Sequence, residues 1–450
     1  MAVTEVDVVV IGLGVGGEEV GGKLAQAGLS VVGIERRLVG GECPYWGCIP
    51  SKMMIRAANV VAEARRVDVL AGQASVTPDW APVAKRIRDE ATDNWDDEVA
   101  VKRFTDAGGQ FIRSTGRLTG PRRVTAEGQD FLARRGVVLN LGTSAAIPPI
   151  EGLAGTPFWT NKEAIEVTTL PSSLIVLGGG AIGLELTQVF ARFGVPVTVI
   201  EAADRLLALE EPESSELAAS LLERDGVAVR TGAGANRVTH DDDGFTVHLA
   251  DGSTVSGERL LVATGRRANT ASAGLETVGL DASARSVEVD DRMRAGDGLW
   301  AVGDVTGKGA FTHVAMYQAG IAIRDILGQD GPPASYRAVP RVTFTDPEIG
   351  CVGLTEAEAR ADGLDVRTSV YPIPSSTRGW IHKAGNEGFI KLVADGDVLV
   401  GATSAGPTGG EVLSALAVAV HARVPLSTLR SMIYAYPTFH RAIEPALAAL

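Results

Sequence analysis

Cys43 and Cys48 lie five residues apart in a chain that has only three cysteines. So few cysteines in 450 residues exclude a disulfide-rich secreted scaffold, and the close pair points to chemistry. In a regular helix this spacing rotates the two residues apart and separates them by about 7.5 Å along the axis, too far for a disulfide. Pro44 suits a helix start, and Gly47 and Pro50 permit distortion around Cys48. We therefore predict a strained, easily reduced disulfide at a helix N-terminus, where the helix dipole stabilises thiolates.

Three more side chains have types that suit the same chemistry. Lys52 lies one helical turn after Cys48, where an ammonium group can partner an electron-rich ring; a solvated helix lysine is the alternative. Glu185 begins another helical segment and is the candidate counter-charge. Cys351 lies beside Val352 in an apolar stretch, and we interpret it as a core thiol.

Two glycine-rich loops follow apolar runs and precede helical segments. In such a loop the first glycine permits a tight turn, the second lets the backbone approach a pyrophosphate, and the third lets helix and strand pack closely. Glu35 and Glu201 end the next strand-like runs, at the same interval after their loops, where a carboxylate accepts hydrogen bonds from ribose hydroxyls. The glycines of this fingerprint are Gly12, Gly14 and Gly17 in the first loop and Gly178, Gly180 and Gly183 in the second.

The composition limits the class of protein. Hydrophobic residues make up 45% and charged residues 22%, an ordinary globular balance that excludes general disorder. The net charge of −13 argues against binding nucleic acid or an anionic membrane, so an anionic cofactor must be held by local dipoles. We find no signal peptide and no apolar run long enough to span a membrane, and we expect a cytoplasmic protein without a resident metal ion.

The elements that must position these residues form a repeated pattern of strand, glycine turn, helix and strand. Further strand-like runs end in glycine turns at 137–142, 259–265 and 298–304, and a helical stretch follows at about 315–327. Pro332-Pro333 marks a boundary. Beyond it we predict strands at 388–393 and 398–402 and apolar helices at 412–422 and 426–433, without a nucleotide fingerprint.

Together these motifs resemble the flavoprotein disulfide reductases, which include dihydrolipoamide dehydrogenase, glutathione reductase and mercuric reductase. The most specific match is the segment from Gly40 to Lys52, supported by Ala263–Arg267, Ala301–Asp304 and Phe344–Gly350. The resemblance covers nearly the whole chain. It implies an α/β fold with two Rossmann-like domains, for FAD (1–150 and 267–332) and for NAD(P) (151–266), and an α+β C-terminal dimerisation domain (333–450).

The resemblance also implies roles for residues. Hydride passes from the nicotinamide to the flavin, which reduces the cysteine disulfide; Cys48 is the charge-transfer thiolate and Cys43 exchanges with substrate. Glu35 binds the adenosine ribose of FAD, Asp304 its ribityl chain, and Lys52 pairs with Glu185 beside the flavin. The implied FAD-binding set is Gly12, Gly14, Gly17, Glu35, Arg36, Gly41, Glu42, Lys52, Gly142, Arg266, Gly303 and Asp304. The implied NAD-binding set is Gly178, Gly180, Gly183, Glu201 and Gly265.

Glu201 bears on which nicotinamide cofactor is used. A carboxylate at this position favours a free 2′-hydroxyl and repels a 2′-phosphate. Ala202 and Ala203 follow it directly, and Arg205 is interpreted as a surface charge. We therefore predict NADH rather than NADPH.

One segment departs from the family pattern. Disulfide-reducing members have a histidine acid–base group there, oriented by a glutamate five residues later. Here Tyr436 takes the histidine's place and Arg441 the glutamate's. A phenol with a pKa near 10 does not shuttle protons at neutral pH as imidazole does. His440 and Glu444 form either a relocated pair on one helix face or a surface pair.

The sequence thus predicts an FAD-dependent NAD(P)H oxidoreductase acting as a homodimer with shared active sites, with Tyr436 and His440 among the candidate catalytic residues. The expected acceptor is a small molecule: a metal ion, a quinone or an unidentified disulfide. The alternatives are a dihydrolipoamide dehydrogenase-type reductase that uses His440, and a flavin redox sensor without turnover.

Overall fold

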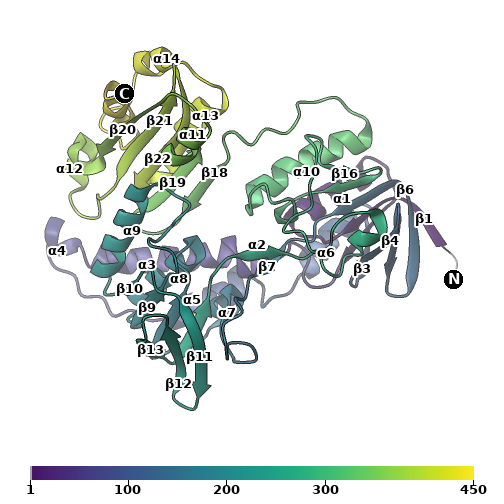
Figure 1. Ribbon diagram of the computed structural model, residues 1–450, viewed down its shortest axis with the longest axis horizontal. Helices are drawn as coiled ribbons and strands as arrows, with labels where there is room; N and C mark the ends of the chain where they lie inside the picture. Colours follow the sequence, from purple (N-terminus) through teal and green to yellow (C-terminus); the bar gives the residue numbers. More distant parts are fainter. Residues whose placement is uncertain (1–2) are drawn as a thin grey trace. The chain divides into compact units, whose positions relative to one another are not determined.

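The computed structural model describes residues 3–450, and the chain divides into two compact units (Figure 1). Unit 1 contains the residues up to 50 together with 86–146 and 266–336, and unit 2 contains 51–85, 147–265 and 337–450. Helices and strands are mixed in both, which confirms the predicted α/β class. The finer division into three domains stays a prediction.

Unit 1 is built on a sheet whose five central strands are parallel, in the order β17-β6-β1-β2-β3. The neighbours of β1 are β2 on one side and β6 on the other, so the strand order reverses at β1. Such a reversal is a topological switch point, and ligands of parallel sheets bind there, outside the carboxyl ends of the strands. Val8, Val9 and Val10 are fully buried in β1, as the near-continuous apolar run of a parallel strand requires. The strands are β1 (Val3–Ile11), β2 (Val31–Glu35), β3 (Gln110–Arg113), β6 (Gln129–Leu139) and β17 (Leu299–Ala301).

Helices α1 (Val15–Gln26) and α10 (Thr312–Leu327) pack against each other in unit 1. Their buried side chains share one core with Val8 and Val10 of β1. This packing fixes the N-terminus of each helix relative to the sheet, which matters for the site described below.

Unit 2 contains a second parallel sheet, in the order β10-β9-β8-β14, that repeats the local plan of the first. The strand β8 (Leu174–Leu177) runs through a glycine loop into α8 (Ala181–Arg192), and β9 (Val197–Ile200) leads to Glu201. A three-stranded antiparallel sheet, β11 (Ala235–Asp241), β12 (Gly244–Leu249) and β13 (Thr254–Gly257), packs its inner face against the same core.

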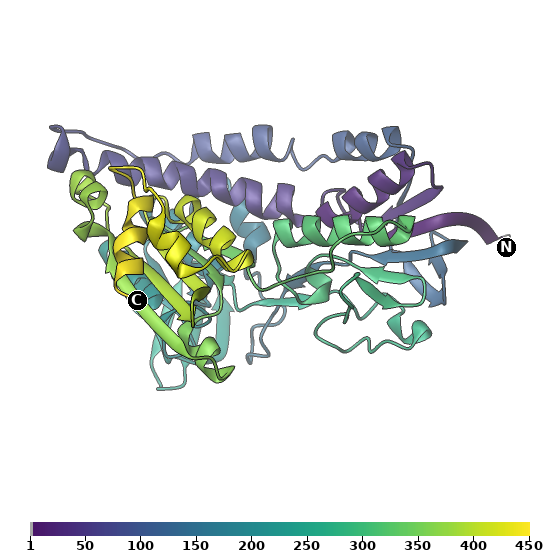
Figure 2. The same ribbon diagram turned by 90° about the horizontal axis from the view of Figure 1, so that it is seen from above.

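The C-terminal part of unit 2 is a five-stranded antiparallel sheet in the order β18-β19-β22-β21-β20. Helix α13 (Gly409–His421) packs on β19 and β22, and α15 (Ile443–Ala448) packs on β20 and β21. In Figure 2 the yellow helices near the C-terminus lie beside the yellow-green strands of this sheet. The predicted strands correspond to β21 (Phe389–Asp395) and β22 (Val398–Gly406), and the predicted helices to α13 and α14 (Leu426–Ser431). Cys351 is buried in β19 (Glu348–Gly353), and burial raises the pKa of its thiol, so it is the core thiol that the sequence predicted.

The remaining helices are α2 (Glu42–Trp46), α3 (Cys48–Ala64), α4 (Val67–Leu70), α5 (Ala81–Arg86), α6 (Glu98–Asp106), α7 (Asn161–Glu166), α9 (Pro212–Arg224), α11 (Glu356–Ala361) and α12 (Thr377–His382). The remaining strands are β4 (Arg117–Gly120), β5 (Arg123–Ala126), β7 (Thr143–Ala145), β10 (Ala228–Arg230), β14 (Arg259–Val262), β15 (Arg266–Ala268), β16 (Arg294–Gly296), β18 (Pro340–Thr343) and β20 (Val366–Pro372). Within residues 3–450, no helix has both the length and the apolar character needed to cross a membrane.

Candidate active site

The first glycine loop joins β1 to α1 at the switch point of the unit 1 sheet. Gly12 has a φ of +92°, and a Cβ there would lie 2.2 Å from the Asn140 carbonyl oxygen. A Cβ on Gly17 would lie 2.0 Å from the Gly12 carbonyl oxygen. Gly14 is the N-cap of α1 and has no side chain to cover the helix N-terminus. The loop therefore presents backbone N–H groups at a positive helix end, which fits the pyrophosphate of a dinucleotide.

The second loop, between β8 and α8, repeats this geometry. A Cβ on Gly178, whose φ is +111°, would lie 2.4 Å from the Ala263 carbonyl oxygen. A Cβ on Gly183 would lie 2.2 Å from the Gly178 carbonyl oxygen, and Gly180 is the N-cap of α8. Two loops with the same close contacts indicate two dinucleotide sites, one in each unit.

The carboxylates that follow the second strands close each loop in the same way. Glu35 accepts hydrogen bonds from the N–H groups of Leu13 (2.9 Å) and Arg37 (2.7 Å). Glu201 accepts them from Gly179 (2.6 Å) and Ala203 (2.7 Å). Each carboxylate oxygen has a further lone pair that can accept a ribose hydroxyl. The neighbouring Arg36 is exposed, and its predicted contact with FAD stays a prediction.

Asn140 is a site residue that the sequence analysis missed. Its Oδ1 accepts a hydrogen bond from the Gly17 N–H (3.0 Å), and its Nδ2 donates to the Val302 carbonyl oxygen (2.8 Å). A Cβ on Gly303 would lie 2.6 Å from the same Nδ2, so Asn140 joins the glycine loop to the segment before Asp304. The available signal was its place directly after a buried strand that ends at the switch point.

A chain of polar contacts in unit 1 connects four side chains, three of which the sequence analysis had named. Arg266 donates to Glu42 Oε2 (2.5 Å) and to Thr143 Oγ1 (2.7 Å), and the Thr143 hydroxyl donates to Asp304 Oδ2 (2.8 Å). Burial raises the pKa of Asp304, against the opposing effects of the Thr143 hydrogen bond and the Arg266 charge. Two carboxylates held in place beside a hydroxyl group suit the binding of a polyhydroxyl chain such as the ribityl group.

The other predicted glycines lie around these loops. A Cβ on Gly41, which has a φ of +71°, would lie 2.9 Å from the Gly14 Cα, so only glycine fits where the cysteine segment crosses the first loop. Gly142 directly precedes β7 and Gly265 directly precedes β15, and these two strands pair with each other.

The cysteine pair spans a break between two helices. Helix α2 ends at Trp46, Gly47 has non-helical dihedrals of −132° and −122°, and α3 begins at Cys48. The break occurs at the glycine that the sequence analysis selected. The structure contains Cys43 and Cys48 as thiols that hydrogen bond to each other, so the disulfide form stays a prediction. The pKa of Cys43 is raised, first by its hydrogen bond to Cys48 and second by burial.

Lys52 and Glu185 form the predicted ion pair, with Nζ and Oε2 2.7 Å apart and the carboxylate side chain 7% exposed. The other oxygen of Glu185 accepts a hydrogen bond from the Phe344 N–H (2.8 Å), and Lys52 Nζ lies 4.6 Å from the centre of the Phe344 ring. Phe344 thus completes a site of three residues, although the sequence predicted no role for it beyond the motif Phe344–Gly350. The position of the pair beside a flavin stays a prediction.

The segment 434–444 does not contain the relocated acid–base pair. Glu444 binds Arg441 instead of His440, with 2.8 Å between Oε2 and Nη2, so the interpretation of His440 and Glu444 as a pair is wrong. Residues 440–442 form a 3₁₀ turn and α15 begins only at Ile443, so His440 and Glu444 do not lie on one face of a continuous α-helix. Arg441 also lies over the ring of Tyr436, at 5.5 Å from its centre, and His440 packs against Tyr434.

Comparisons with known proteins agree with this geometry. Residues 6–319 match the family model described as pyridine nucleotide-disulphide oxidoreductase, and residues 339–447 match the dimerisation domain of that family. The chain is 32% identical to a dihydrolipoyl dehydrogenase of Bacillus subtilis (strain 168), over 99% of this chain and 98% of that protein. It is 32% identical to a mercuric reductase of Bacillus cereus, over 92% of this chain but only 66% of that longer protein.

Among solved structures, the chain is similar to the Cu(II) complex of the HOCl-induced flavoprotein disulfide reductase RclA from Escherichia coli. The TM-score is 0.86 at 26% sequence identity, over 98% of this chain and 99% of that one.

Proposed function

Because the chain belongs to the pyridine nucleotide-disulphide oxidoreductase family, we propose that its Cys43–Cys48 pair delivers electrons from NAD(P)H to a thiophilic metal ion. The chain is an NAD(P)H-dependent flavoprotein oxidoreductase with FAD as its prosthetic group. The observation that carries the choice of acceptor is the state of segment 434–444. There Tyr436 stands where the family has its imidazole, and Glu444 is bound to Arg441, so the segment lacks the imidazole–carboxylate pair that serves a disulfide substrate as general acid.

The names of the related proteins support the same choice. One relative is a mercuric reductase, and one structural neighbour was solved as a Cu(II) complex. A pair of adjacent thiols is a good ligand set for such soft or borderline metal ions. Cys48 is exposed and Cys43 is half-buried, so a small ion can reach the sulfurs.

The residues of unit 1 fit FAD, and those of unit 2 fit a nicotinamide dinucleotide. The glycine loops hold the pyrophosphates through backbone N–H groups, and Glu35 and Glu201 accept ribose hydroxyls. When bound, FAD supplies hydride acceptance from NAD(P)H and two-electron reduction of the Cys43–Cys48 disulfide. The two reduced sulfurs then bind the acceptor, lose both thiol protons and give up two electrons as the S–S bond forms again. Two cupric ions become two cuprous ions in this step.

The nicotinamide cofactor is proposed to be NADH. Glu201 lies where it would repel a 2′-phosphate. Arg205, which the sequence analysis interpreted as a surface charge, donates hydrogen bonds to Ser215 Oγ (2.6 Å) and to the Ala208 carbonyl oxygen (2.8 Å). These neutral acceptors hold the guanidinium in place and leave its charge intact, so the proposal of NADH rests on Glu201.

The working form is proposed to be a homodimer in which segment 434–444 of one protomer completes the active site of its partner. A dimerisation domain of the family covers residues 339–447. Its surface exposes large apolar side chains, among them Ile433 (98%), Trp380 (73%) and Tyr436 (67%), which a second copy can cover.

A stopped-flow comparison tests the acceptor. Enzyme reduced anaerobically with NADH is mixed with Cu²⁺, lipoamide or menadione, and reoxidation is followed by flavin absorbance. We expect Cu²⁺ to react fastest, and Cys43→Ser and Cys48→Ser each to slow it by at least about 100-fold. The matched control is Cys351→Ala in the protein core, which should leave this rate unchanged.

Each other outcome contradicts the proposal in a different way. Fastest reaction with lipoamide would make the protein a disulfide reductase. Fast reaction with menadione that persists in both cysteine variants would mean that the flavin reduces quinones directly. No reaction with any acceptor would favour a redox sensor.

A further inference from the structure

A strained turn precedes helix α6 in unit 1. Asp93, Asn94 and Trp95 have φ angles of +46°, +55° and +57°, whereas the other non-glycine residues with positive φ within 3–450 occur singly. The left-handed conformation is unfavourable for a residue with a Cβ, less so for asparagine and aspartate than for a bulky residue such as tryptophan. Such strain persists only where the surrounding structure holds it, and it clusters at functional sites. The contacts of Trp95 therefore indicate what this turn maintains.

Hydrogen bonds fix the turn to the π-helical segment before it. Thr92 is 1% exposed, and its Oγ1 donates to the Ile87 carbonyl oxygen (3.1 Å) and accepts the Trp95 N–H (3.4 Å). The Asn94 N–H donates to the Arg88 carbonyl oxygen (2.6 Å). These bonds set the direction in which the Trp95 side chain leaves the backbone.

The residues of this turn contact the cysteine segment on both sides of Cys43. The Trp95 Nε1–H donates to the carbonyl oxygen of Tyr45, two residues after Cys43, at 3.3 Å. The Asp97 carboxylate accepts the N–H of Val39, four residues before Cys43, at 2.6 Å. The partners are 50 and 58 residues apart in the sequence, and the sequence analysis gave no role to Trp95 or Asp97.

The Asp97 carboxylate is itself fixed in place. It is buried, and both of its oxygens accept hydrogen bonds from Arg113 Nη2 at 2.7 Å. Arg113 is the last residue of β3, a strand of the parallel sheet. The backbone at Val39 is therefore tied through this ion pair to the sheet of unit 1.

Helix α2 needs such contacts, because it is too short to hold Cys43 by itself. It has five residues, begins after Gly41 without a side-chain cap and ends before Gly47. Isolated helices shorter than about 12 residues are marginal in water, so the position of α2 depends on its tertiary contacts. Tyr45 is the buried residue of this helix, and its carbonyl oxygen is the one that Trp95 binds.

We propose that Trp95 and Asp97 are positioning residues that hold α2, and with it Cys43, within bonding reach of Cys48. In each cycle the S–S bond breaks as the pair gains two electrons and two protons, drawn from NAD(P)H and solvent. The bond forms again as the pair gives two electrons to the acceptor and releases both protons, so the sulfurs must return to the same separation every time. The proposal rests on the proposed function only for this reversible disulfide.

The test follows the FAD-containing enzyme after anaerobic stopped-flow mixing with NADH. Bleaching of the flavin absorbance reports the first step, reduction of FAD, and growth of the thiolate-to-flavin charge-transfer absorbance reports the second step, reduction of the cysteine disulfide. Trp95→Phe keeps an aromatic ring and removes the Nε1–H donor. It should slow the second step at least about tenfold, because misplaced reacting atoms react slowly. The FAD content and the rate of the first step should stay unchanged, which a general loss of folding would not allow.

A matched pair of variants tests the left-handed turn itself. Asn94→Gly accepts a positive φ and should keep the rate of the second step within about twofold of the wild type. Asn94→Val introduces a β-branched residue that resists this conformation and should slow the second step at least about threefold. This variant replaces Trp95→Phe should the latter fail to retain FAD. Trp80→Phe, which removes an indole hydrogen bond to the Val167 carbonyl oxygen in unit 2, should leave the second step unchanged.

Three results would overturn the proposal. One is an unchanged second step in a Trp95→Phe variant that retains FAD. Another is equal slowing in Asn94→Gly and Asn94→Val, which would assign the effect to the lost amide. The third is equal slowing in Trp80→Phe, which would assign the effect to any lost indole contact. A wild type without charge-transfer absorbance would remove the reversible disulfide and the proposed function with it, whereas a failed copper assay would leave this result intact, since no acceptor is added.

Discussion

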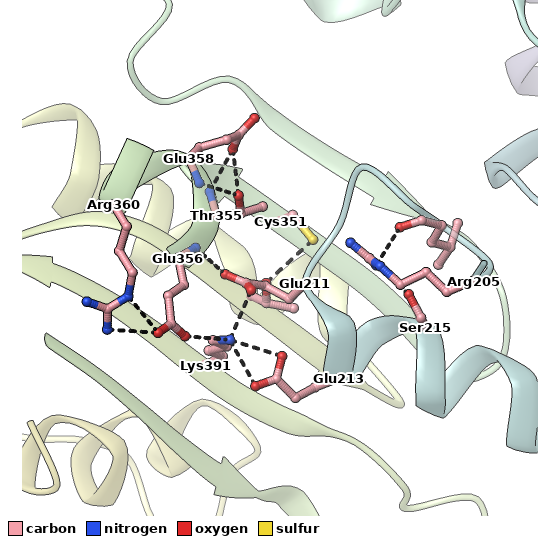
Figure 3. Close-up of polar contacts among 12 residues, drawn as sticks. Arg205, Glu211, Glu213, Ser215, Cys351, Thr355, Glu356, Glu358, Arg360 and Lys391 are labelled. Carbon is pink, nitrogen blue, oxygen red and sulfur yellow. Dashed lines mark hydrogen bonds and ion pairs between the residues drawn. The ribbon is translucent and has the colours of Figure 1, made fainter. Parts of the chain in front are cut away.

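Lys391 presents a buried ion cluster whose energetic role can be tested directly. Its side chain is 3% exposed, and its Nζ lies 2.9 Å from Glu211, 2.9 Å from Glu213 and 3.2 Å from Glu356 (Figure 3). Glu211, also almost fully buried, accepts in addition the Glu356 N–H at 2.7 Å. The cluster joins the start of α9 to β21 and α11 within unit 2.

Replacing Lys391 by methionine keeps the aliphatic bulk but removes the only cation that contacts the buried Glu211 in this group. Removing one member of a buried ion cluster costs about 3–5 kcal/mol, because the partner is left as an uncompensated charge. Glu213→Gln should cost about 1 kcal/mol or less, since the Glu213 side chain is 32% exposed and water can solvate what remains. The two variants should therefore differ severalfold in their effect on the free energy of unfolding.

The pH dependence has a defined sign. Burial opposes the charge on Lys391, but hydrogen bonds to Glu213 and Glu211 outweigh it and raise the pKa. A cation with a raised pKa in the folded state stabilises the fold fully below its unfolded value, near 10.4, and loses this effect only as pH rises through the folded value. Titration of Lys391 should therefore not change the free energy of unfolding of the wild type between about pH 6 and 9.

Urea unfolding of the FAD-containing protein, followed by circular dichroism at several pH values, measures these effects. Lys102→Met is the matched control, because that lysine is 70% exposed and pairs only on the helix surface. Lys391→Met with Glu211→Gln should recover at least half of the lost stability. A Lys391→Met variant within about 1 kcal/mol of the wild type at pH 8 would refute the reasoning.

Two further predictions concern the dinucleotide loops and the departure from the family pattern. Gly183→Ala places a Cβ 2.2 Å from the Gly178 carbonyl oxygen, so the KM for NADH should rise about tenfold or more while the FAD content stays unchanged. Gly17→Ala should instead lower the FAD content. Equal effects of either variant on both cofactors would contradict the assignment of one loop to each cofactor. Tyr436→His combined with Arg441→Glu restores an imidazole and a carboxylate to the segment. The rate of lipoamide reduction in a steady-state NADH assay should therefore rise about 10- to 100-fold. An unchanged rate would show that this segment does not limit disulfide turnover.

The local parts of the candidate site could be predicted from the sequence because their geometry is set by neighbours in the chain. Gly12 and Gly178 make the tight turns expected of them, and Glu35 and Glu201 return to their loops after one strand–helix–strand unit. Gly47 interrupts the helix between the cysteines, as the spacing required. In each case covalent geometry and the periods of helix and strand leave few alternatives.

The pairing of Arg441 with Glu444 marks the limit of that approach. The interval between His440 and Glu444 suits one continuous α-helix, but a 3₁₀ turn at 440–442 precedes α15, and Glu444 pairs with Arg441 instead. A choice between these two helix types depends on how the segment packs against the sheet beneath it, and residue spacing alone does not contain that information.

By itself, the amino-acid sequence determined the two loops, their carboxylates, the cysteine pair and the α/β class. Only the tertiary structure decided that Asn140 closes the first loop, that Phe344 completes the Lys52–Glu185 pair and that Thr312 reaches the sulfur of Cys48. These partners are separated by more than one hundred residues, and their approach depends on strand order and helix packing. Such contacts follow from the global arrangement of elements, which no local period of the sequence specifies.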